Sequence, residues 1–405
     1  MRIKAFQAWR PAPQLAAKVA SLPYDVVNTA EARELSKGNA NSFFHVSRAE
    51  IDLPAGTDLH AEQVYQKAAE NFRRLLSDGV LVREDKPSLY VYRLVRGTHE
   101  QRGIVAVCHV GDYERNVIKK HEKTRKAPED DRTKHIDATN AHSGPVFLAY
   151  RDQAEINRIA ARTEQGAPLY DFTAADGIRH TVWRLSDAGA VVEAFARVPE
   201  AYIADGHHRA AAAVRVALRR AAGGKAAGDE EYNWFLAVLF PAGQLCILPY
   251  NRCVHDLNGL SQEKFLEAVR QHFRVTEGAD PEPAKPGHIS MYLAGKWYGL
   301  YWAPDAAPDP VSSLDVSVLQ DRLLSPVLAI DDPRSSPRIE FVGGIRGTAE
   351  LVKKVDSGKA AVAFSMYPTT VEQLMRISDA GQTMPPKSTW FEPKLRDGLL
   401  IHTLD

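Results

Sequence analysis

The sequence predicts an α+β protein with mixed sheets and flanking helices, in two parts that comprise residues 1–280 and 281–405. Strand-like and helix-like segments alternate along the chain, which indicates strands and helices packed in layers rather than an all-α or all-β fold. Three prolines at positions 281, 283 and 286 mark the boundary, because proline interrupts both helices and central strands. No internal repeat occurs, and the only low-complexity tract is an alanine-rich helix.

The first part opens with a well-defined amphipathic helix and a hairpin. Residues 58–79 predict the helix, since Asp58 can cap it, apolar residues recur on one face and Gly79 follows. Residues 89–95 and 104–110 predict two strands joined by a polar turn. The other elements expected here are strands at 41–46, 146–150, 181–185 and 202–204 and helices at 188–196 and from 207 to about 222.

The rest of the chain predicts shorter elements with more frequent turns. Residues 234–240 and 245–248 are expected to pair as a hairpin, and Ser261 is expected to cap a helix that runs to Phe273. Residues 291–302 predict a compact hairpin. The remaining expected elements are helices at 316–328, 349–355 and 371–377 and strands at 339–342 and 360–364.

Composition limits the classes of function. The chain has 405 residues, 44% of them hydrophobic and 25% charged, as in ordinary globular proteins. Its 51 basic and 51 acidic residues balance, which argues against a nucleic-acid partner. Three scattered cysteines predict neither disulfides nor a zinc site. Residues 1–11 lack the apolar core of a signal peptide and no run is long enough to cross a bilayer, so we expect a cytoplasmic protein without a membrane partner. A homodimer is compatible with this composition.

The most informative segment reads Tyr202-Ile203-Ala204-Asp205-Gly206-His207-His208-Arg209. An apolar strand ends at Asp205, and a strong helix former begins right after Gly206. Such a turn directs the unpaired N–H groups of a helix N-terminus at one point, beside a guanidinium and two imidazoles, which favours a bound phosphate. The alternative is an ordinary strand–helix turn with polar surface residues.

A second unusual segment concentrates charge. It contains Lys119, Lys120, His121, Glu122, Lys123, Thr124 and Arg125 in succession. One interpretation is a loop or helix start whose cations bind a polyphosphate, with Glu122 available for Mg²⁺ or for proton transfer. The other is a solvated helix face, the usual place of a charge run.

Three further segments carry candidate site residues. Asp25 follows a proline-led extended stretch and is either a general base or a turn residue. Asn41, Ser42 and His45 could reach a substrate from the end of a strand. Near the C-terminus, Lys387, Ser388 and Thr389 lie in a proline-rich loop that suits an anion or simple packing. No Walker A, Gly-rich dinucleotide or kinase catalytic-loop signature is present. The adjacent pair His207 and His208 is a poor arrangement for one metal ion, so zinc is disfavoured.

Four separated motifs together resemble one family. They are Pro23-Tyr24-Asp25-Val26-Val27, Lys120-His121-Glu122-Lys123-Thr124, Asp205-Gly206-His207-His208-Arg209 and the run from Met384 to Lys394. The chain resembles, over nearly its whole length, the SerB-cotranscribed upstream proteins, catalogued as domain-of-unknown-function family 1015, whose genes often lie beside serine-biosynthesis genes.

More distantly, the turn from Gly206 to Arg209 is similar to the phosphate-contacting Gly-x-His-Arg turn of the ParB/sulfiredoxin-like superfamily. That resemblance implies a ParB/sulfiredoxin-like nucleotide-binding core with large insertions in residues 1–280 and a C-terminal α+β lobe in 281–405. Sulfiredoxins carry a catalytic cysteine where this chain has His207, so sulfinic-acid repair is not expected. The superfamily also includes free serine kinases, in which an N-terminal carboxylate acts as the base, and Asp25 is the nearest candidate in chain order.

The first hypothesis is therefore a small-molecule kinase that transfers phosphate from ATP or ADP to a hydroxyl of serine or a related hydroxy acid. The nucleotide would lie on residues 206–209, with the 119–125 segment neutralising its charge. Asp25 or Glu122 would accept the proton, and Asp205 or Glu122 would hold Mg²⁺. The alternatives are a nucleotide-binding regulator without turnover and a metal-dependent phosphatase.

Overall fold

The computed structural model describes residues 1–223, 228–303 and 309–405, which form two compact units. One unit comprises Met1–Leu245 together with Pro393–Asp405, and the other comprises Cys246–Glu392. The expected α+β class with mixed sheets and flanking helices is confirmed. The division lies upstream of residues 278–287, because the prolines there occupy a loop inside the sheet of the second unit rather than a connection between units.

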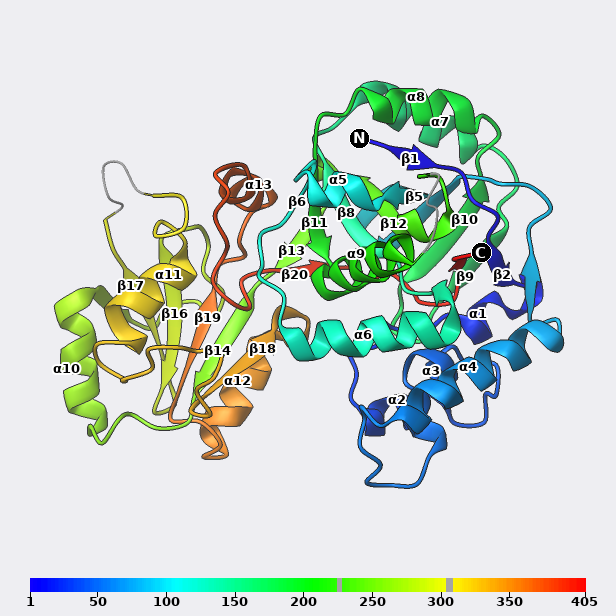
Figure 1. The fold of residues 1–405 in the computed structure, drawn as a ribbon. Helices are drawn as coiled ribbons and strands as arrows, with labels where there is room; N and C mark the ends of the chain where they lie inside the picture. The colour runs from blue at the N-terminus through cyan, green and yellow to red at the C-terminus, as the bar shows by residue number, and fades with distance from the viewer. Residues whose placement is uncertain (224–227, 304–308) are drawn as a thin grey trace. The chain divides into compact units, whose positions relative to one another are not determined.

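A nine-stranded mixed sheet forms the centre of the first unit, counted in the described residues (Figure 1). Its order is β6-β11-β8-β12-β5-β4-β10-β9, with β1 paired to β5; β11 runs parallel to β6, and β12 parallel to β8. The strands are β1 (Ile3–Lys4), β4 (Tyr90–Arg96), β5 (His99–His109), β6 (Ile118–Lys119), β8 (Val146–Tyr150), β9 (Tyr170–Thr173), β10 (Arg179–Arg184), β11 (Ala201–Asp205) and β12 (Trp234–Pro241).

Burial explains the central position of β12. All eight of its residues are buried, as expected for a strand covered on both faces. The alanines of α9 (His207–Ala222) pack on this part of the sheet, because small side chains let a helix approach closely. Figure 1 shows α6 (Lys126–Thr139) running beside α9. The other helices of this unit are α1 (Ala16–Val19), α2 (Thr29–Ser36), α3 (Phe44–Ser47), α4 (Glu62–Ser77), α5 (Val110–Glu114), α7 (Ala154–Thr163) and α8 (Ala188–Ala196).

The last residues of the chain return to the first unit. There β21 (His402–Thr403) pairs with β7 (Ala141–His142), as β2 (Trp9–Pro11) pairs with β3 (Leu81–Arg83). The backbone of Asp397 exchanges hydrogen bonds with Ser21, and the N–H of Gly398 donates to Ser143. These bonds hold residues 393–405 against segments that are more than 250 residues away in sequence.

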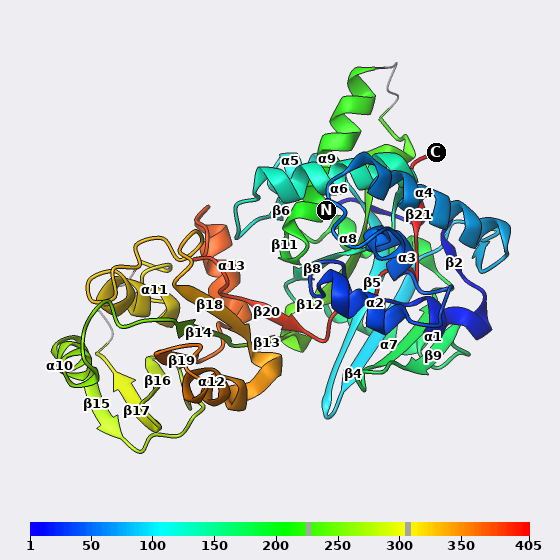
Figure 2. The ribbon, with the colours of Figure 1, turned by 90° about the horizontal axis from the view of Figure 1, so that it is seen from below.

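The second unit has a six-stranded antiparallel sheet in the order β15-β17-β16-β19-β14-β18 (Figure 2). Its strands are β14 (Tyr250–Val254), β15 (Arg274–Glu277), β16 (His288–Leu293), β17 (Lys296–Tyr301), β18 (Ile339–Gly343) and β19 (Val362–Met366). A separate pair joins β13 (Cys246–Leu248) to β20 (Trp390–Glu392). The helices are α10 (Gln262–His272), α11 (Asp315–Leu319), α12 (Gly347–Asp356) and α13 (Val371–Asp379), with a π-helical turn at Gln320–Leu324.

One expected strand pairing and one expected strand are wrong. Residues 234–240 and 245–248 do not form a hairpin, because β5 and β8 already occupy both edges of β12 and β13 pairs with β20. Residues 41–46 are not a strand; they lead into the single turn α3, in which Phe43 and Val46 face one apolar cluster. That spacing of three suits a helix, whereas a strand needs alternation.

Two helix termini also differ from expectation. Helix α4 begins at Glu62 rather than at Asp58, whose carboxylate accepts a hydrogen bond from the His60 N–H in the preceding turn. The helix expected at 316–328 is α11 followed by the π-helical turn. By contrast, Ser261 caps α10 as predicted, and α8 and α9 end where the sequence places them.

Candidate functional site

The turn between β11 and α9 has the geometry expected from its sequence. Gly206 has φ +94°, a conformation that favours glycine, and it precedes the first helical residue. No side chain of a described residue caps this end of α9, where the first N–H groups of a helix lack partners within the helix. Arg209 lies under the turn: a Cβ on Gly206 would be 2.9 Å from the Arg209 Nε. The absence of a side chain at residue 206 therefore makes room for the guanidinium.

We expect Gly206→Ala to lower the free energy of unfolding by about 1–3 kcal/mol, because a side chain at this φ is strained and must displace the Arg209 guanidinium. Chemical denaturation measures the change. Gly223→Ala at the other end of α9 is the matched control, since Gly223 has φ −90° and a Cβ there would be 3.6 Å from the Arg220 carbonyl oxygen, an ordinary contact. Equal losses in the two variants would contradict a requirement for glycine at the turn.

One carboxylate at the turn is held by two cations. Asp205 Oδ2 is 3.3 Å from an Arg209 Nη2 and 3.4 Å from the Lys394 Nζ, and both of these cations are at least nine-tenths buried. Burial alone would raise the pKa of Asp205, but Lys394, Arg209 and the neighbouring His207 lower it to about 2. Asp205 is therefore ionised at neutral pH, and its Oδ1 accepts no hydrogen bond from a described residue.

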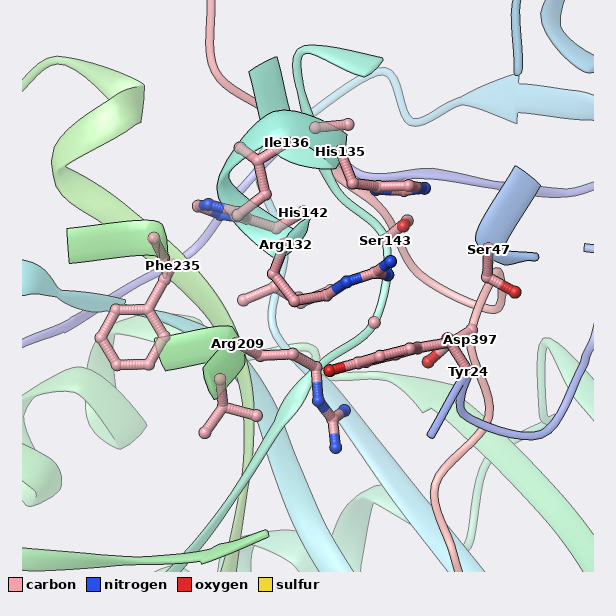
Figure 3. Close-up of a pocket in the computed structure, with 15 residues that line it drawn as sticks. Tyr24, Ser47, Arg132, His135, Ile136, His142, Ser143, Arg209, Phe235 and Asp397 are labelled. Atoms are coloured by element: carbon pink, nitrogen blue, oxygen red, sulfur yellow. The ribbon is translucent and has the colours of Figure 1, made fainter. Parts of the chain in front are cut away.

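Arg209 connects this carboxylate to a buried pocket. Its Nη1 donates to the carbonyl of Pro145, and its Nε is buried without a hydrogen-bond partner among the described residues. The pocket has a cavity volume of about 40 Å³. In the view of Figure 3, Arg132 lies above the Tyr24 ring and Arg209 below it, and the Arg132 guanidinium is 3.7 Å from the ring centroid. Two guanidinium groups therefore line one small space.

The pocket also contains a carboxyl group with unusual acidity. Asp397 is 3% exposed, and its Oδ1 has no hydrogen-bond partner among the described residues. Burial raises its pKa to about 7; Arg209 and Arg132 oppose this effect, and the charges of Asp25 and Asp205 add to it. A Cβ on Gly144 would be 2.7 Å from Oδ1, so glycine is needed beside this carboxyl. Near neutral pH, Asp397 can both accept and release a proton.

Two buried histidines lie at the start of α9. The rings of His121 and His207 pack edge to face with centroids 4.4 Å apart. Burial lowers the pKa of His121 to about 4, and burial with the nearby His121 holds the pKa of His207 well below its usual value. Both imidazoles are therefore neutral, and His207 Nε2 is buried without a partner among the described residues. His208 instead accepts a hydrogen bond from the Arg125 N–H at 3.0 Å.

The charged run at residues 120–125 is a loop between β6 and α6 rather than a helix face, while Lys119 belongs to β6 and Lys126 to α6. Lys119 pairs with Glu200 at 2.5 Å, and Lys120 lies 4.0 Å from the centroid of the Tyr113 ring. Only His121 of this segment is buried beside α9. The other members are Glu122 and Lys123, which are exposed, Thr124, which donates to Glu129, and Arg125.

The remaining predicted residues lie in other surroundings. His45 Nδ1 is 2.8 Å from Asp52 and its Nε2 is 3.1 Å from the Asn39 carbonyl, so both ring nitrogens are already engaged. Ser42 Oγ accepts a hydrogen bond from the Phe44 N–H, and the Asn41 N–H donates to Asn39 Oδ1. Lys387, Ser388 and Thr389 belong to the second unit, in the loop before β20. Asp25 is exposed, and its charge acts on Arg209 and Asp397.

A larger cavity adjoins the pocket. It has a cavity volume of about 310 Å³ and shares Tyr24, Ser47, Arg132 and His135 with the first. Its far wall comes from α4 and includes Val64. Both polar and apolar side chains line it.

Sequence reasoning missed Asp397, Lys394 and Arg132. Lys394 belonged to the C-terminal motif, but nothing local distinguished it from a surface lysine. Arg132 lies in α6 among other charged residues, and Asp397 lies in a short loop. The return of the chain to the first unit brings Lys394 and Asp397 to this region, whereas Arg132 reaches the pocket from α6.

Two findings concern metals and membranes. Across residues 1–223, 228–303 and 309–405, no group of three or more His, Cys, Asp or Glu side chains is placed to hold a metal ion. No helix in the same ranges is long and apolar enough to cross a membrane.

By fold, the protein is an α+β protein in which an uncapped helix N-terminus adjoins buried cations and carboxyl groups. It belongs to the family described as protein of unknown function DUF1015, whose model matches residues 3–317. That match ends before Lys394 and Asp397.

Among solved structures, a free serine kinase in complex with AMP is similar at 13% identity and TM-score 0.39, over 74% of this chain and 91% of that chain. A variant of that kinase in complex with ADP has the same TM-score and identity, over 74% and 92%. A C-terminally truncated SbnI from Staphylococcus aureus matches at 12% identity and TM-score 0.38, over 74% and 87%. No curated protein matches the chain.

Proposed function

We propose that the protein is a phosphotransferase that moves a phosphoryl group from ATP or ADP to a hydroxyl of a small acceptor, serine or a related hydroxy acid. One observation carries the proposal: the uncapped N-terminus of α9 opens beside two buried cations, Arg209 and Lys394, and two carboxyl groups of different acidity, Asp205 and Asp397. Cations and helix N–H groups suit phosphate, whereas a carboxyl group with a pKa near 7 suits proton transfer.

Phosphate binding is assigned to the turn. The N–H groups of residues 207–209 and the guanidinium of Arg209 stabilise the charge that the transferred phosphoryl group carries. Lys394 adds a second cation. The neutral His207 contributes a buried ring nitrogen without drawing a proton from the phosphate. The loop at 120–125 lies next to this turn through the bond between Arg125 and His208 and contributes further positive charge.

Two carboxyl groups are assigned different roles. Asp205 is ionised, and its Oδ1 together with nucleotide phosphates could hold Mg²⁺, which usually takes one or two carboxylates and keeps several waters. When bound, Mg²⁺ would neutralise charge on the phosphates. Glu122 is the other candidate ligand. Asp397, or Asp25 at the exposed edge, would take the proton of the acceptor hydroxyl. The adjoining cavity of about 310 Å³ has room for a small acceptor.

The test is a turnover assay on the full chain. The protein is incubated with ATP or ADP, Mg²⁺ and a panel of hydroxylated metabolites that includes L-serine, and phosphorus NMR follows the products. We expect a new phosphomonoester together with ADP or AMP.

The alternatives give other outcomes. A regulator would bind nucleotide without turnover, and a phosphatase would release inorganic phosphate from a phosphomonoester without nucleotide. If no acceptor in the panel yields a phosphomonoester, the kinase proposal fails for that panel.

A further inference from the structure

The second unit contains a buried cation that no carboxylate neutralises among the residues described. Arg252 of β14 is 3% exposed and forms no ion pair with a described residue. Its Nη1 donates to the carbonyl of Tyr250 and its Nη2 to the carbonyl of Lys387 at 3.2 Å. Burial lowers the pKa of Arg252 to about 10. A buried charge held only by carbonyls is costly to retain, so its presence requires an explanation.

The sheet register shows which way Arg252 faces. Its neighbour Cys253 packs with Val342 and Leu351 against α12. Because strand side chains alternate, Arg252 and its cross-strand partner Phe341 face the other side. The guanidinium lies 5.4 Å from the centroid of the Phe341 ring. Both residues line a cavity of about 290 Å³, which the π-helical turn at 320–324 also borders.

Two further features of this cavity point to a ligand. The Oε1 of Gln320 is buried without a hydrogen-bond partner among the described residues, although its Nε2 donates to Ile330 at 2.7 Å. Gln320 begins the π-helical turn, an arrangement frequent at functional sites. Lys387, whose carbonyl holds Arg252, has φ +54°, which is uncommon for a residue other than glycine. The cavity thus offers the cationic guanidinium of Arg252 as a donor and Gln320 Oε1 as an acceptor.

We propose that this cavity binds a small monocarboxylic acid that also carries a hydrogen-bond donor, such as an α-hydroxy acid or an α-amino acid. Arg252 has donors left after its two carbonyl bonds and would take the carboxylate. Gln320 Oε1 would accept from the hydroxyl or ammonium group. Asp309 and Asp321 also line the cavity, and their charges disfavour a doubly charged phosphate.

This site is independent of the proposed phosphotransfer, since all of its residues belong to the second unit and the turn at Gly206 belongs to the first. It also gives a role to the proline-rich run 384–389, from which Pro385 and Pro386 line the cavity.

The test follows the Arg252 guanidinium directly. The full chain is produced with isotope-labelled arginine, the Nε–H signal of Arg252 is assigned by its loss in Arg252→Met, and L-lactate, L-serine, acetate and inorganic phosphate are titrated in turn. We expect a saturable shift with L-lactate and L-serine, weaker binding of acetate and no shift with phosphate. No saturable shift with any carboxylate would overturn the proposal, and an equal response to phosphate would overturn its carboxylate selectivity.

Two variants separate binding from structure. Arg252→Met, an apolar replacement of similar size, is expected to keep the fold and to weaken L-lactate binding about tenfold or more, read by calorimetry. Gln320→Met should weaken L-lactate and leave acetate unchanged. Arg209→Lys should leave the Arg252 response unchanged, so that failure of phosphotransfer and failure of this site are distinguishable. If Arg252→Met lowers the melting temperature and leaves L-lactate binding intact, Arg252 only ties the 384–389 loop to β14.

Discussion

Replacing Arg209 by alanine is expected to weaken nucleotide binding by roughly 10- to 150-fold, because a hydrogen bond to a charged group contributes about 1.5–3 kcal/mol. Arg209 lies directly at the turn: its Nε would be 2.9 Å from a Cβ on Gly206, and its free Nε–H lies in the pocket. Isothermal calorimetry with ADP and ATP measures the affinity. An unchanged affinity would show that phosphate does not bind at this turn.

The alanine variant also removes a partner of Asp205, which leaves that carboxylate with Lys394 and is expected to cost stability. Arg209→Lys therefore accompanies it, since lysine keeps the charge but cannot reach both Pro145 and Asp205 in the planar geometry of a guanidinium. We expect lysine to recover part of the affinity.

The matched control is Arg215→Ala on the same helix. Arg215 is half exposed and pairs with Asp130 and Glu129 of α6. Exposed ion pairs of this kind contribute little to stability. We expect its nucleotide affinity to equal that of the unsubstituted protein. A loss similar to that of Arg209→Ala would indicate a general effect on α9.

The turn at Gly206 could be predicted from sequence because every signal for it is local. A buried strand, a glycine that permits φ +94° and an alanine-rich helix follow one another within a few residues. The helix start, the position of the glycine and the end of α9 therefore agree between expectation and structure.

The groups around that turn could not be predicted, because they come from distant parts of the chain. Asp397 and Lys394 belong to the first unit, but in the sequence they come after the whole of the second unit. A sequence gives no local signal that a carboxyl group will be buried beside Arg209 and Arg132. The same limit explains the wrong hairpin at 234–248, since the partners of β12 are β5 and β8, which lie far upstream in the chain.

The charged segment at 119–125 shows a second limit of prediction from sequence. The 119–125 segment is one continuous polar run in the sequence, yet its side chains have different contacts in the structure. Lys119 has a carboxylate partner in Glu200, Lys120 packs on Tyr113, and His121 is buried beside His207. The residue types of a charged loop therefore do not indicate which of its side chains face a site, because that depends on contacts with other parts of the chain.

Replacing Asp397 by asparagine is expected to have the largest effect on turnover, a loss of about 10²–10⁴-fold if this carboxyl takes the proton of the acceptor hydroxyl. With the Asp397 pKa at about 7, the proposed activity of the native protein should increase as pH rises through that value, because the ionised form is the base. The residual activity of Asp397→Asn should lack this step. Asp25→Asn is the matched comparison. If Asp25→Asn loses more turnover than Asp397→Asn, and if the activity of Asp397→Asn still rises at about pH 7, proton transfer is assigned to Asp25.

The raised pKa of Asp397 should also make the stability of the fold depend on pH, which can be measured without an activity assay. Its pKa is raised from 3.8 to about 7 on folding, so between these values the folded protein binds a proton that the unfolded chain releases. Stability therefore falls as pH rises from about 4 to about 7, and the cost at neutral pH is on the order of 4 kcal/mol. Asparagine cannot ionise, so Asp397→Asn should lose less stability than the native chain between about pH 5 and about pH 8, as measured by thermal unfolding at both values. The contrary result is a native chain whose stability does not change between about pH 5 and about pH 8 and equals that of the variant. It would mean that Asp397 is already ionised at about pH 5 and that its pKa in the pocket is ordinary.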